Sequence, residues 1–190
     1  MEKECSVVVV DDQYVSRSFF EIHVGMSKGY ALAASLSGAE QAIAFCLAHP
    51  VDLVIMDVMM KYGLDGLTCA KTIHCNNPGV RIILTTSTAE AQWIHEAWEA
   101  GIDSFWFKEY SDIPLTEVMD RTMDGESVYP DSLPNPEFGI ARKAGSDRAG
   151  AGGAAGADPQ LYQRGDCPAA AHFRKYRTHS YSAHAGKDRI

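Results

Sequence analysis

Short apolar runs that each end in a polar residue constrain this chain more than any other feature. Four such runs lead directly into Asp11-Asp12, Asp57, Thr85 and Lys108. Runs of this length and composition are typical of strands buried on both faces of a parallel sheet. The carboxyl ends of parallel strands share one edge of a sheet, where ligands bind. We therefore expect three carboxylates, a hydroxyl and an ammonium to meet there, a set suited to a divalent cation and a phosphoryl group.

The segments between these runs predict a regular alternation of strands and helices. The expected strands are the apolar runs at 7–10, 30–36, 51–56, 81–84 and 104–107. The expected helices are the segments with helical spacing or helix-ending signals at 13–26, 39–48, 67–74, 90–100 and 114–123. Strict alternation of this kind predicts an α/β fold, a doubly wound five-stranded parallel sheet with right-handed crossovers.

Charge is spread unevenly over the 190 residues, whose formal net charge is −8. Residues 1–126 hold 8 basic and 19 acidic side chains, so we expect no nucleic-acid binding by this part. The five cysteines form no CxxC pair and predict reduced thiols. The first apolar run is four valines shortly after Glu2, Lys3 and Glu4, so we expect no signal peptide, and no apolar stretch reaches membrane-spanning length. We expect a cytoplasmic protein with no membrane partner.

A set of polar residues at specific intervals resembles the receiver domain of two-component response regulators. The matching positions are Asp11-Asp12, Asp57, Asp65-Gly66, Thr85 and Lys108. Their intervals are 45 residues from Asp12 to Asp57, then 28 to Thr85 and 23 to Lys108. The resemblance covers residues 1–125 and is strongest for regulators of the NarL/LuxR type.

The resemblance implies a phosphorylated switch. A sensor histidine kinase would transfer a phosphoryl group to Asp57, and water would later remove it. Mg²⁺ is the implied cofactor, and its implied ligands are Asp11, Asp12, Asp57 and the backbone carbonyl of Met59. Lys108 would pair with one phosphoryl oxygen and the Thr85 hydroxyl with another. In the switch that follows, Thr85 moves toward the phosphoryl group and the aromatic Phe105 turns inward.

Three departures from the family pattern lie in the loops beside this site. Lys61 and Tyr62 stand where the family has a proline, and the loop that follows Asp57 is one residue longer. Glu109 follows Lys108, where the family usually has a proline after a cis peptide bond. A cis bond before a non-proline residue costs about 2.5–4 kcal/mol. We expect this loop to be trans and rearranged, or strained.

Other readings of the same residues stay open. Asp11-Asp12 could cap the next helix, Thr85 could simply end a strand, and Lys108 could be solvated. An aspartyl-phosphate phosphatase would also use an Asp nucleophile and Mg²⁺. Such enzymes typically carry a second Asp two residues after the nucleophile, where this chain has Met59. We therefore expect no enzyme activity beyond self-phosphorylation and autodephosphorylation.

The composition changes after residue 125. Residues 126–144 hold several prolines and predict a linker, and 145–190 form a low-complexity tail expected to be largely disordered. One hypothesis is that 145–190 is an out-of-frame remnant of a helix-turn-helix domain. A one-base shift over Ser146–Ala155 permits the string L-T-E-R-E-x-E-V-L-R, which resembles that domain. The alternative is a natural low-complexity tail.

The resemblance to the NarL/LuxR type implies a lineage of transcription regulators. DNA binding is expected in that family. The tail as written holds no recognition helix, so we expect no sequence-specific DNA binding by this chain. Formation of a homodimer stays open. The alternative function is a stand-alone receiver that acts by protein–protein contact or as a phosphate sink.

Overall fold

A five-stranded parallel sheet forms the centre of the computed structural model, which describes residues 4–130. The strands follow the order β2-β1-β3-β4-β5 and have the bounds β1 Cys5–Val10, β2 Tyr30–Leu36, β3 Leu53–Asp57, β4 Arg81–Thr86 and β5 Ser104–Phe107. The helices between and after them are α1 Tyr14–Met26, α2 Ala39–Ala48, α3 Gly66–Asn76, α4 Ala91–Glu99 and α5 Leu115–Met123. The predicted α/β fold is confirmed. The predicted tail, 145–190, and most of the predicted linker lie outside the described residues.

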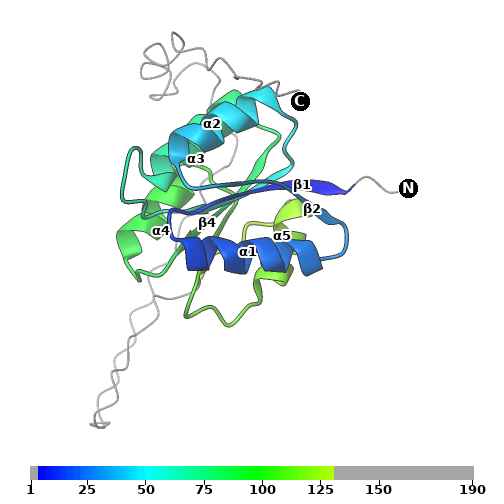
Figure 1. Cartoon of the computed structure of the whole chain (residues 1–190). Helices are drawn as coiled ribbons and strands as arrows, with labels where there is room; N and C mark the ends of the chain where they lie inside the picture. Colours follow the sequence, from blue (N-terminus) through cyan, green and yellow to red (C-terminus); the bar gives the residue numbers. More distant parts are fainter. Residues whose placement is uncertain (1–3, 131–190) are drawn as a thin grey trace, which may run out of the picture.

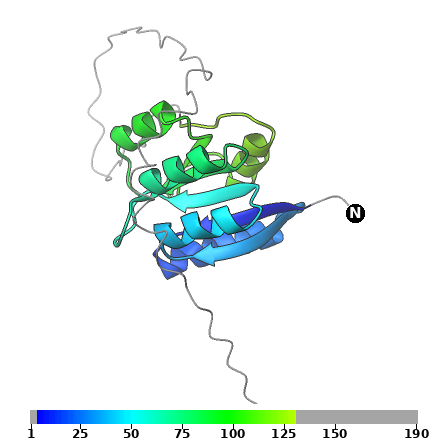
Figure 2. The ribbon, with the colours of Figure 1, turned by 90° about the horizontal axis from the view of Figure 1, so that it is seen from above.

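Helices cover both faces of the sheet. Helices α1 and α5 lie on one side, and α2, α3 and α4 lie on the other (Figure 1). Seen from above, α2, α3 and α4 run side by side across their face (Figure 2). The strands supply both cores by alternation: Val8 and Val10 of β1 belong to the cluster under α2–α4, whereas Val7 and Val9 belong to the cluster under α1 and α5. Both faces are therefore apolar, as the continuous apolar runs predict.

Local signals set the ends of several elements. Strand β2 and helix α2 have the bounds expected from the sequence, and α2 stops just before His49 and Pro50. Helix α3 is longer than expected because the Asp65 carboxylate caps its start, accepting a hydrogen bond from the backbone of Thr68. Among helices α1 to α5, none combines the length and the apolar character that crossing a membrane needs.

The chain turns back along β5 after α5. Gly125 takes a positive φ of 90°, a conformation that favours glycine, and ends the helical segment. The backbone carbonyl of Val128 then accepts a hydrogen bond from the N–H of Phe105 in β5, at 2.8 Å. The Tyr129 hydroxyl donates to the carbonyl of Ile102 at 2.7 Å. The described part of the predicted linker, 126–130, therefore packs on the sheet's last strand.

Candidate functional site

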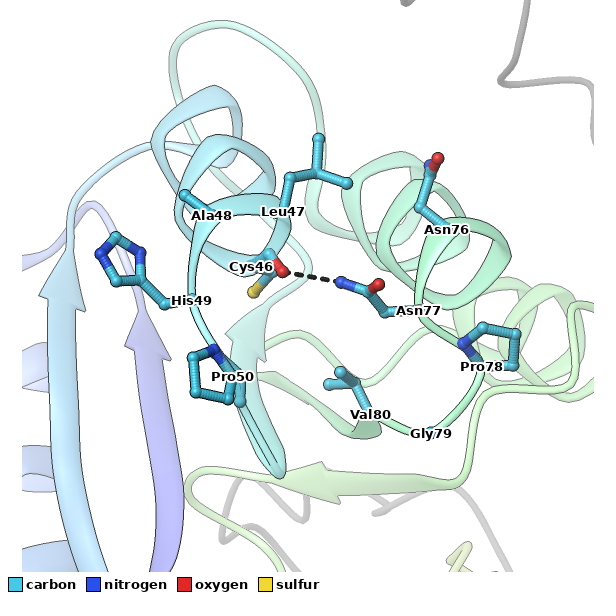
Figure 3. A pocket seen from close by; sticks show the side chains of 11 residues that line it. Cys46, Leu47, Ala48, His49, Pro50, Asn76, Asn77, Pro78, Gly79 and Val80 are labelled. Carbon is cyan, nitrogen blue, oxygen red and sulfur yellow. Dashed lines mark hydrogen bonds between the residues drawn. The ribbon is translucent and has the colours of Figure 1, made fainter.

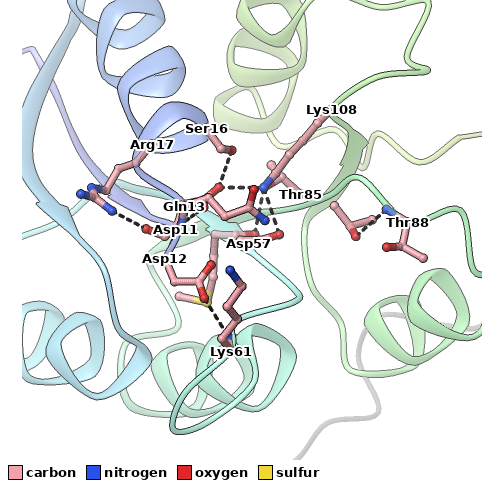
Figure 4. Close-up of polar contacts among 12 residues, drawn as sticks. Asp11, Asp12, Gln13, Ser16, Arg17, Asp57, Lys61, Thr85, Thr88 and Lys108 are labelled. Carbon is pink, nitrogen blue, oxygen red and sulfur yellow. Dashed lines mark hydrogen bonds and ion pairs between the residues drawn. The ribbon is translucent and has the colours of Figure 1, made fainter.

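The register of the sheet brings the predicted polar residues to one edge. Met56 in β3 pairs with Val10, the residue before Asp11, and Asp57 pairs with Thr85 of β4. Lys108 directly follows β5, and its N–H donates to the carbonyl of Thr86 at 2.9 Å. All of these positions are at carboxyl ends of neighbouring strands, which is why they meet (Figure 4).

Asp11 is the most completely engaged of the three carboxylates. It is fully buried, and its Oδ1 accepts a hydrogen bond from the N–H of Gln13 at 2.8 Å. Its Oδ2 accepts from the Ser16 hydroxyl at 2.5 Å and from the Lys108 ammonium at 2.7 Å. The Arg17 guanidinium donates to the Asp11 backbone carbonyl at 2.8 Å. Helix α1 thus holds Asp11 from its first turn, through residues that the sequence pattern did not single out.

Asp12 has a carboxylate oxygen that is free to bind a ligand. Its Oδ2 accepts a hydrogen bond from the backbone N–H of Lys61 at 2.7 Å, while its Oδ1 is buried and has no hydrogen-bond partner. A buried carboxylate oxygen without a partner is costly unless a cation or water meets it. One oxygen each of Asp11, Asp12 and Asp57 lies within 4.8 Å of the others. A set of carboxylate oxygens at this spacing fits a small hard cation such as Mg²⁺.

Asp57, the third carboxylate of this cluster, is 2% exposed, and the Lys108 Nζ lies 3.1 Å from its Oδ1. Burial is the largest influence on this carboxyl and raises its pKa to about 6. The charge of Lys108 and the backbone N–H of Met59 lower the pKa, and the neighbouring Asp11 raises it. Asp57 is therefore ionised at neutral pH but poorly compensated, so added positive charge would stabilise it.

The Thr85 hydroxyl is bonded to the backbone of β3, at the residue before Asp57. Thr85 is fully buried, and its Oγ1 donates to the carbonyl of Met56 at 3.3 Å. Phe105, the expected switch aromatic, is 2% exposed and packs against Phe107 and Tyr129. Thr85 is thus near the cluster but occupied elsewhere.

The loop after β5 keeps Lys108 within reach of the site without a proline. The peptide bond between Lys108 and Glu109 is trans, as are all described peptide bonds. The Phe107 N–H donates to the Ser111 hydroxyl at 3.1 Å, which closes this loop on itself. The expected trans peptide bond is the one that the structure has.

Gly66 lets the start of α3 lie close to the backbone of Asp57, which the sequence pattern did not predict. A Cβ at Gly66 would lie 1.9 Å from the carbonyl oxygen of Asp57 and 2.8 Å from its carbonyl carbon. The N–H of Gly66 also donates to the Val58 carbonyl at 2.9 Å. An Asp-Gly pair is an ordinary turn signal, but here the glycine lets the start of α3 pack directly on the backbone of the site.

A second hollow lies at the opposite edge of the sheet and lacks comparable chemistry. It measures about 510 Å³ and is lined by the ends of α2 and α3, where Asn77 donates to the Cys46 carbonyl at 2.7 Å (Figure 3). Its ionisable lining consists of Cys46 and His49. Burial raises the pKa of the Cys46 thiol to about 11, so the thiol stays protonated at neutral pH. We assign no function to this hollow.

Comparison with known proteins defines the class. The family model described as the response regulator receiver domain matches residues 7–120. The chain belongs to this family, and it is a receiver of the two-component response regulators.

Curated relatives point to the same class. The chain is 27% identical over 135 residues to a nitrate/nitrite response regulator protein homolog of Haemophilus influenzae, covering 71% of this chain and 64% of that protein. It is 27% identical over 133 residues to the Fimbriae Z protein of Salmonella typhimurium, covering 70% and 63%. It is 26% identical over 123 residues to the response regulator VraR of Staphylococcus aureus, covering 65% and 58%. The match therefore spans less than two thirds of each of these relatives.

Solved structures share the fold. A LuxR-family response regulator from Aurantimonas sp. SI85-9A1 has a TM-score of 0.62 at 21% identity, covering 69% of this chain and 91% of that one. The receiver domain of RcsB from Salmonella enterica serovar Typhimurium, with the phosphomimetic BeF₃⁻, has a TM-score of 0.61 at 18% identity, covering 67% and 94%.

Proposed function

We propose that Asp57 accepts a phosphoryl group from a phosphohistidine of a sensor kinase. The observation that supports this most is the buried Asp57 carboxylate with an ammonium 3.1 Å away and an unpartnered Asp12 oxygen in the same cluster. An oxygen of Asp57 attacks the phosphorus, the P–N bond breaks, and the leaving imidazole keeps its electron pair. Attack by water on phosphorus later breaks the P–O bond and restores the carboxylate.

The neighbouring side chains neutralise and position the transferred group. Phosphoryl transfer depends mainly on alignment and charge compensation. The Lys108 ammonium already faces Asp57 and would pair with a phosphoryl oxygen as a point charge. The Thr85 hydroxyl would leave the carbonyl of Met56 and donate to another phosphoryl oxygen. This exchange would free space beside Phe105, the proposed switch aromatic.

The carboxylate cluster is the proposed magnesium site. Asp12 and Asp57 would bind the ion directly, Asp11 directly or through water, and the Met59 carbonyl would complete the protein ligands. Mg²⁺ supplies the positive charge that lets this acidic pocket accept a phosphoryl group. Asp11 already accepts hydrogen bonds from Gln13, Ser16 and Lys108, which leaves it fewer free lone pairs than Asp12 and favours its link through water.

The proposed role of the whole chain follows from its division into parts and from its relatives. We assign residues 1–125 to the receiver, 126–144 to a linker and 145–190 to the tail. We propose a cytoplasmic regulator of transcription by lineage, since structures of RcsB dimers bound to DNA share this fold. A gel-shift assay with the 190-residue chain tests whether it binds DNA. We expect no sequence-specific binding, and tight, sequence-selective binding would contradict the expected lack of a recognition helix.

Phosphorylation by a small phosphodonor tests the central claim. The purified chain is treated with acetyl phosphate and Mg²⁺, and the modified residue is mapped by mass spectrometry. We expect one phosphoryl group, on Asp57, that hydroxylamine or base removes. Asp57→Asn should abolish it, whereas Asp124→Asn, at an exposed carboxylate after α5, should not. An Asp57→Asn variant that still gains the same acyl phosphate would refute the proposal.

The same preparation tests enzyme activity. The chain has Met59 where an aspartyl-phosphate phosphatase typically has its second Asp, so we propose that it does not hydrolyse added phosphoesters. Sustained release of phosphate from added phosphoesters, lost in Asp57→Asn, would contradict this.

A further inference from the structure

Carboxylates on three sides hold the loop between β3 and α3. The backbone N–H of Lys61 donates to Asp12 Oδ2 at 2.7 Å, and that of Leu64 donates to Glu40 Oε1 at 3.2 Å. Asp65 accepts hydrogen bonds from both the N–H and the hydroxyl of Thr68 at 2.8 Å. The loop is therefore attached to β1, α2 and α3, and its position relative to the acidic cluster is defined.

Gly63 brings the loop close to α2. Its φ is +82°, and a Cβ there would lie 2.6 Å from Glu40 Oε1. The positive φ favours glycine at this position, and the loop backbone here lies against the Glu40 carboxylate. This contact with α2 lies two residues from Lys61.

The Lys61 side chain points at the acidic cluster. In Figure 4 it extends toward Asp57 from below, while Lys108 reaches Asp57 from above. Its backbone N–H donates to Asp12, which fixes the start of the side chain beside the cluster. The residue itself is exposed and free to adjust to a ligand.

The charge balance of the site leaves room for a second cation. In the phosphorylated site Asp11 and Asp12 keep their charges, and the acyl phosphate carries about two negative charges in place of the Asp57 carboxylate, so the negative charge exceeds that of Lys108 and one divalent cation by about one. We propose that Lys61 is a second phosphoryl-binding cation, which pairs with an oxygen of the group carried by Asp57. This inference rests on the proposed phosphorylation of Asp57.

The proposal predicts effects of opposite sign on two ligands. In the unmodified protein the Lys61 ammonium repels Mg²⁺, so removing the charge should tighten magnesium binding roughly two- to fivefold. With an anion on Asp57 the same ammonium is attractive, so removing it should weaken binding of that anion roughly two- to fivefold. A change that merely disturbed the loop would weaken both ligands, because Asp12 would lose its position.

Calorimetric titration of the full chain separates these cases. The variants are Lys61→Gln, which removes the charge, Lys61→Arg, which keeps it, and Lys28→Gln, which removes an exposed lysine charge between α1 and β2. Each is titrated with Mg²⁺ alone, and then with beryllofluoride at saturating Mg²⁺. We expect Lys61→Gln to bind Mg²⁺ more tightly and beryllofluoride more weakly, with Lys61→Arg and Lys28→Gln close to the parent.

Any other pattern in Lys61→Gln overturns the inference, including unchanged binding or a loss for both ligands. A fault in the proposed function itself would look different. The parent would then fail to bind beryllofluoride with Mg²⁺, or Asp57→Asn would bind it as well as the parent does.

Discussion

The Nζ atom of Lys108 lies 2.7 Å from Oδ2 of Asp11, closer than the 3.1 Å that separates it from Asp57. All three side chains are nearly buried, with at most 10% exposure for Lys108. The one ammonium is therefore shared between two carboxylates that repel each other. Its loss would leave both without a cation in a poorly solvated place.

Lys108→Met tests this sharing, because it removes the charge but keeps an apolar stem. We expect the variant to lose about 3–5 kcal/mol of unfolding free energy at pH 8, the usual cost of breaking a buried pair. The loss should be smaller at pH 5, where Asp57 takes up a proton. Urea unfolding at the two pH values, in the presence of a chelator, measures the difference. Lys28→Met is the matched control, and an equal loss at both pH values would argue against a shared cation.

The raised pKa of Asp57 predicts how stability depends on pH. The pKa is about 6 in the folded protein against an ordinary value of 3.8, so the folded state binds this proton more tightly. This tighter proton binding contributes to the free energy of unfolding. The contribution is fully present below about pH 4 and is lost as the pH rises through 6. Asp57→Asn, which cannot ionise, should be more stable than the parent by about 2–3 kcal/mol at pH 8 and nearly equal at pH 4.

Urea unfolding of both proteins in a chelator, from pH 4 to pH 8, checks this expectation. The difference between the two curves isolates Asp57 because the other titrating groups are common to both. Added Mg²⁺ should stabilise the parent at pH 8 and leave Asp57→Asn almost unchanged. A difference that grows toward low pH would show that the sign is wrong.

Substitution by alanine should have opposite effects on the free energy of unfolding at Gly66 and at Gly25. A Cβ at Gly66 would overlap the backbone of Asp57, whereas a Cβ at Gly25 would meet nothing within 4 Å. Gly66→Ala should cost about 3 kcal/mol or more, since backbone rather than a flexible side chain must move. Gly25→Ala, within α1, should gain about 0.5–1 kcal/mol from helix propensity. Chemical unfolding of both variants measures this, and similar effects at the two positions would contradict the packing described.

Strand and helix positions were predictable because their signals are local. The bounds of β2 and α2 follow from glycines, a His-Pro pair and the apolar pattern between them. The strand order β2-β1-β3-β4-β5 could not be read in this way, because periodicity does not tell which strands are neighbours. The gathering of Asp11, Asp57 and Lys108 followed from one general property of parallel sheets, that all strands end at the same edge.

The contacts that complete the site lay beyond sequence reasoning. Ser16 and Arg17 bind Asp11 across one helical turn, but serine and arginine at that spacing are common in any helix. Thr85 was expected to face the phosphoryl group, and its bond to the Met56 carbonyl depends on side-chain rotation that no pattern encodes.

A buried chain of hydroxyl groups ties β5, α5 and the segment after it together. The Val128 N–H donates to Ser104 Oγ at 3.1 Å, and Ser104 Oγ lies 2.7 Å from Thr122 Oγ1. Thr122 gives its one hydroxyl hydrogen to the Val118 carbonyl at 2.6 Å, so Ser104 must donate to Thr122. Both hydroxyl side chains are fully buried.

Ser104→Ala should therefore cost about 1–3 kcal/mol, since it leaves the Val128 N–H buried without an acceptor. Thr122→Val should cost a similar amount, because Ser104 then lacks an acceptor for its hydrogen. The double variant should lose less than the sum, by about 0.5–1 kcal/mol or more, because no Ser104 hydroxyl remains to be left unpaired. Urea unfolding of the four proteins completes the cycle, with exposed Ser87→Ala as a control expected to change little. Strictly additive losses would mean that the two hydroxyl groups do not depend on each other.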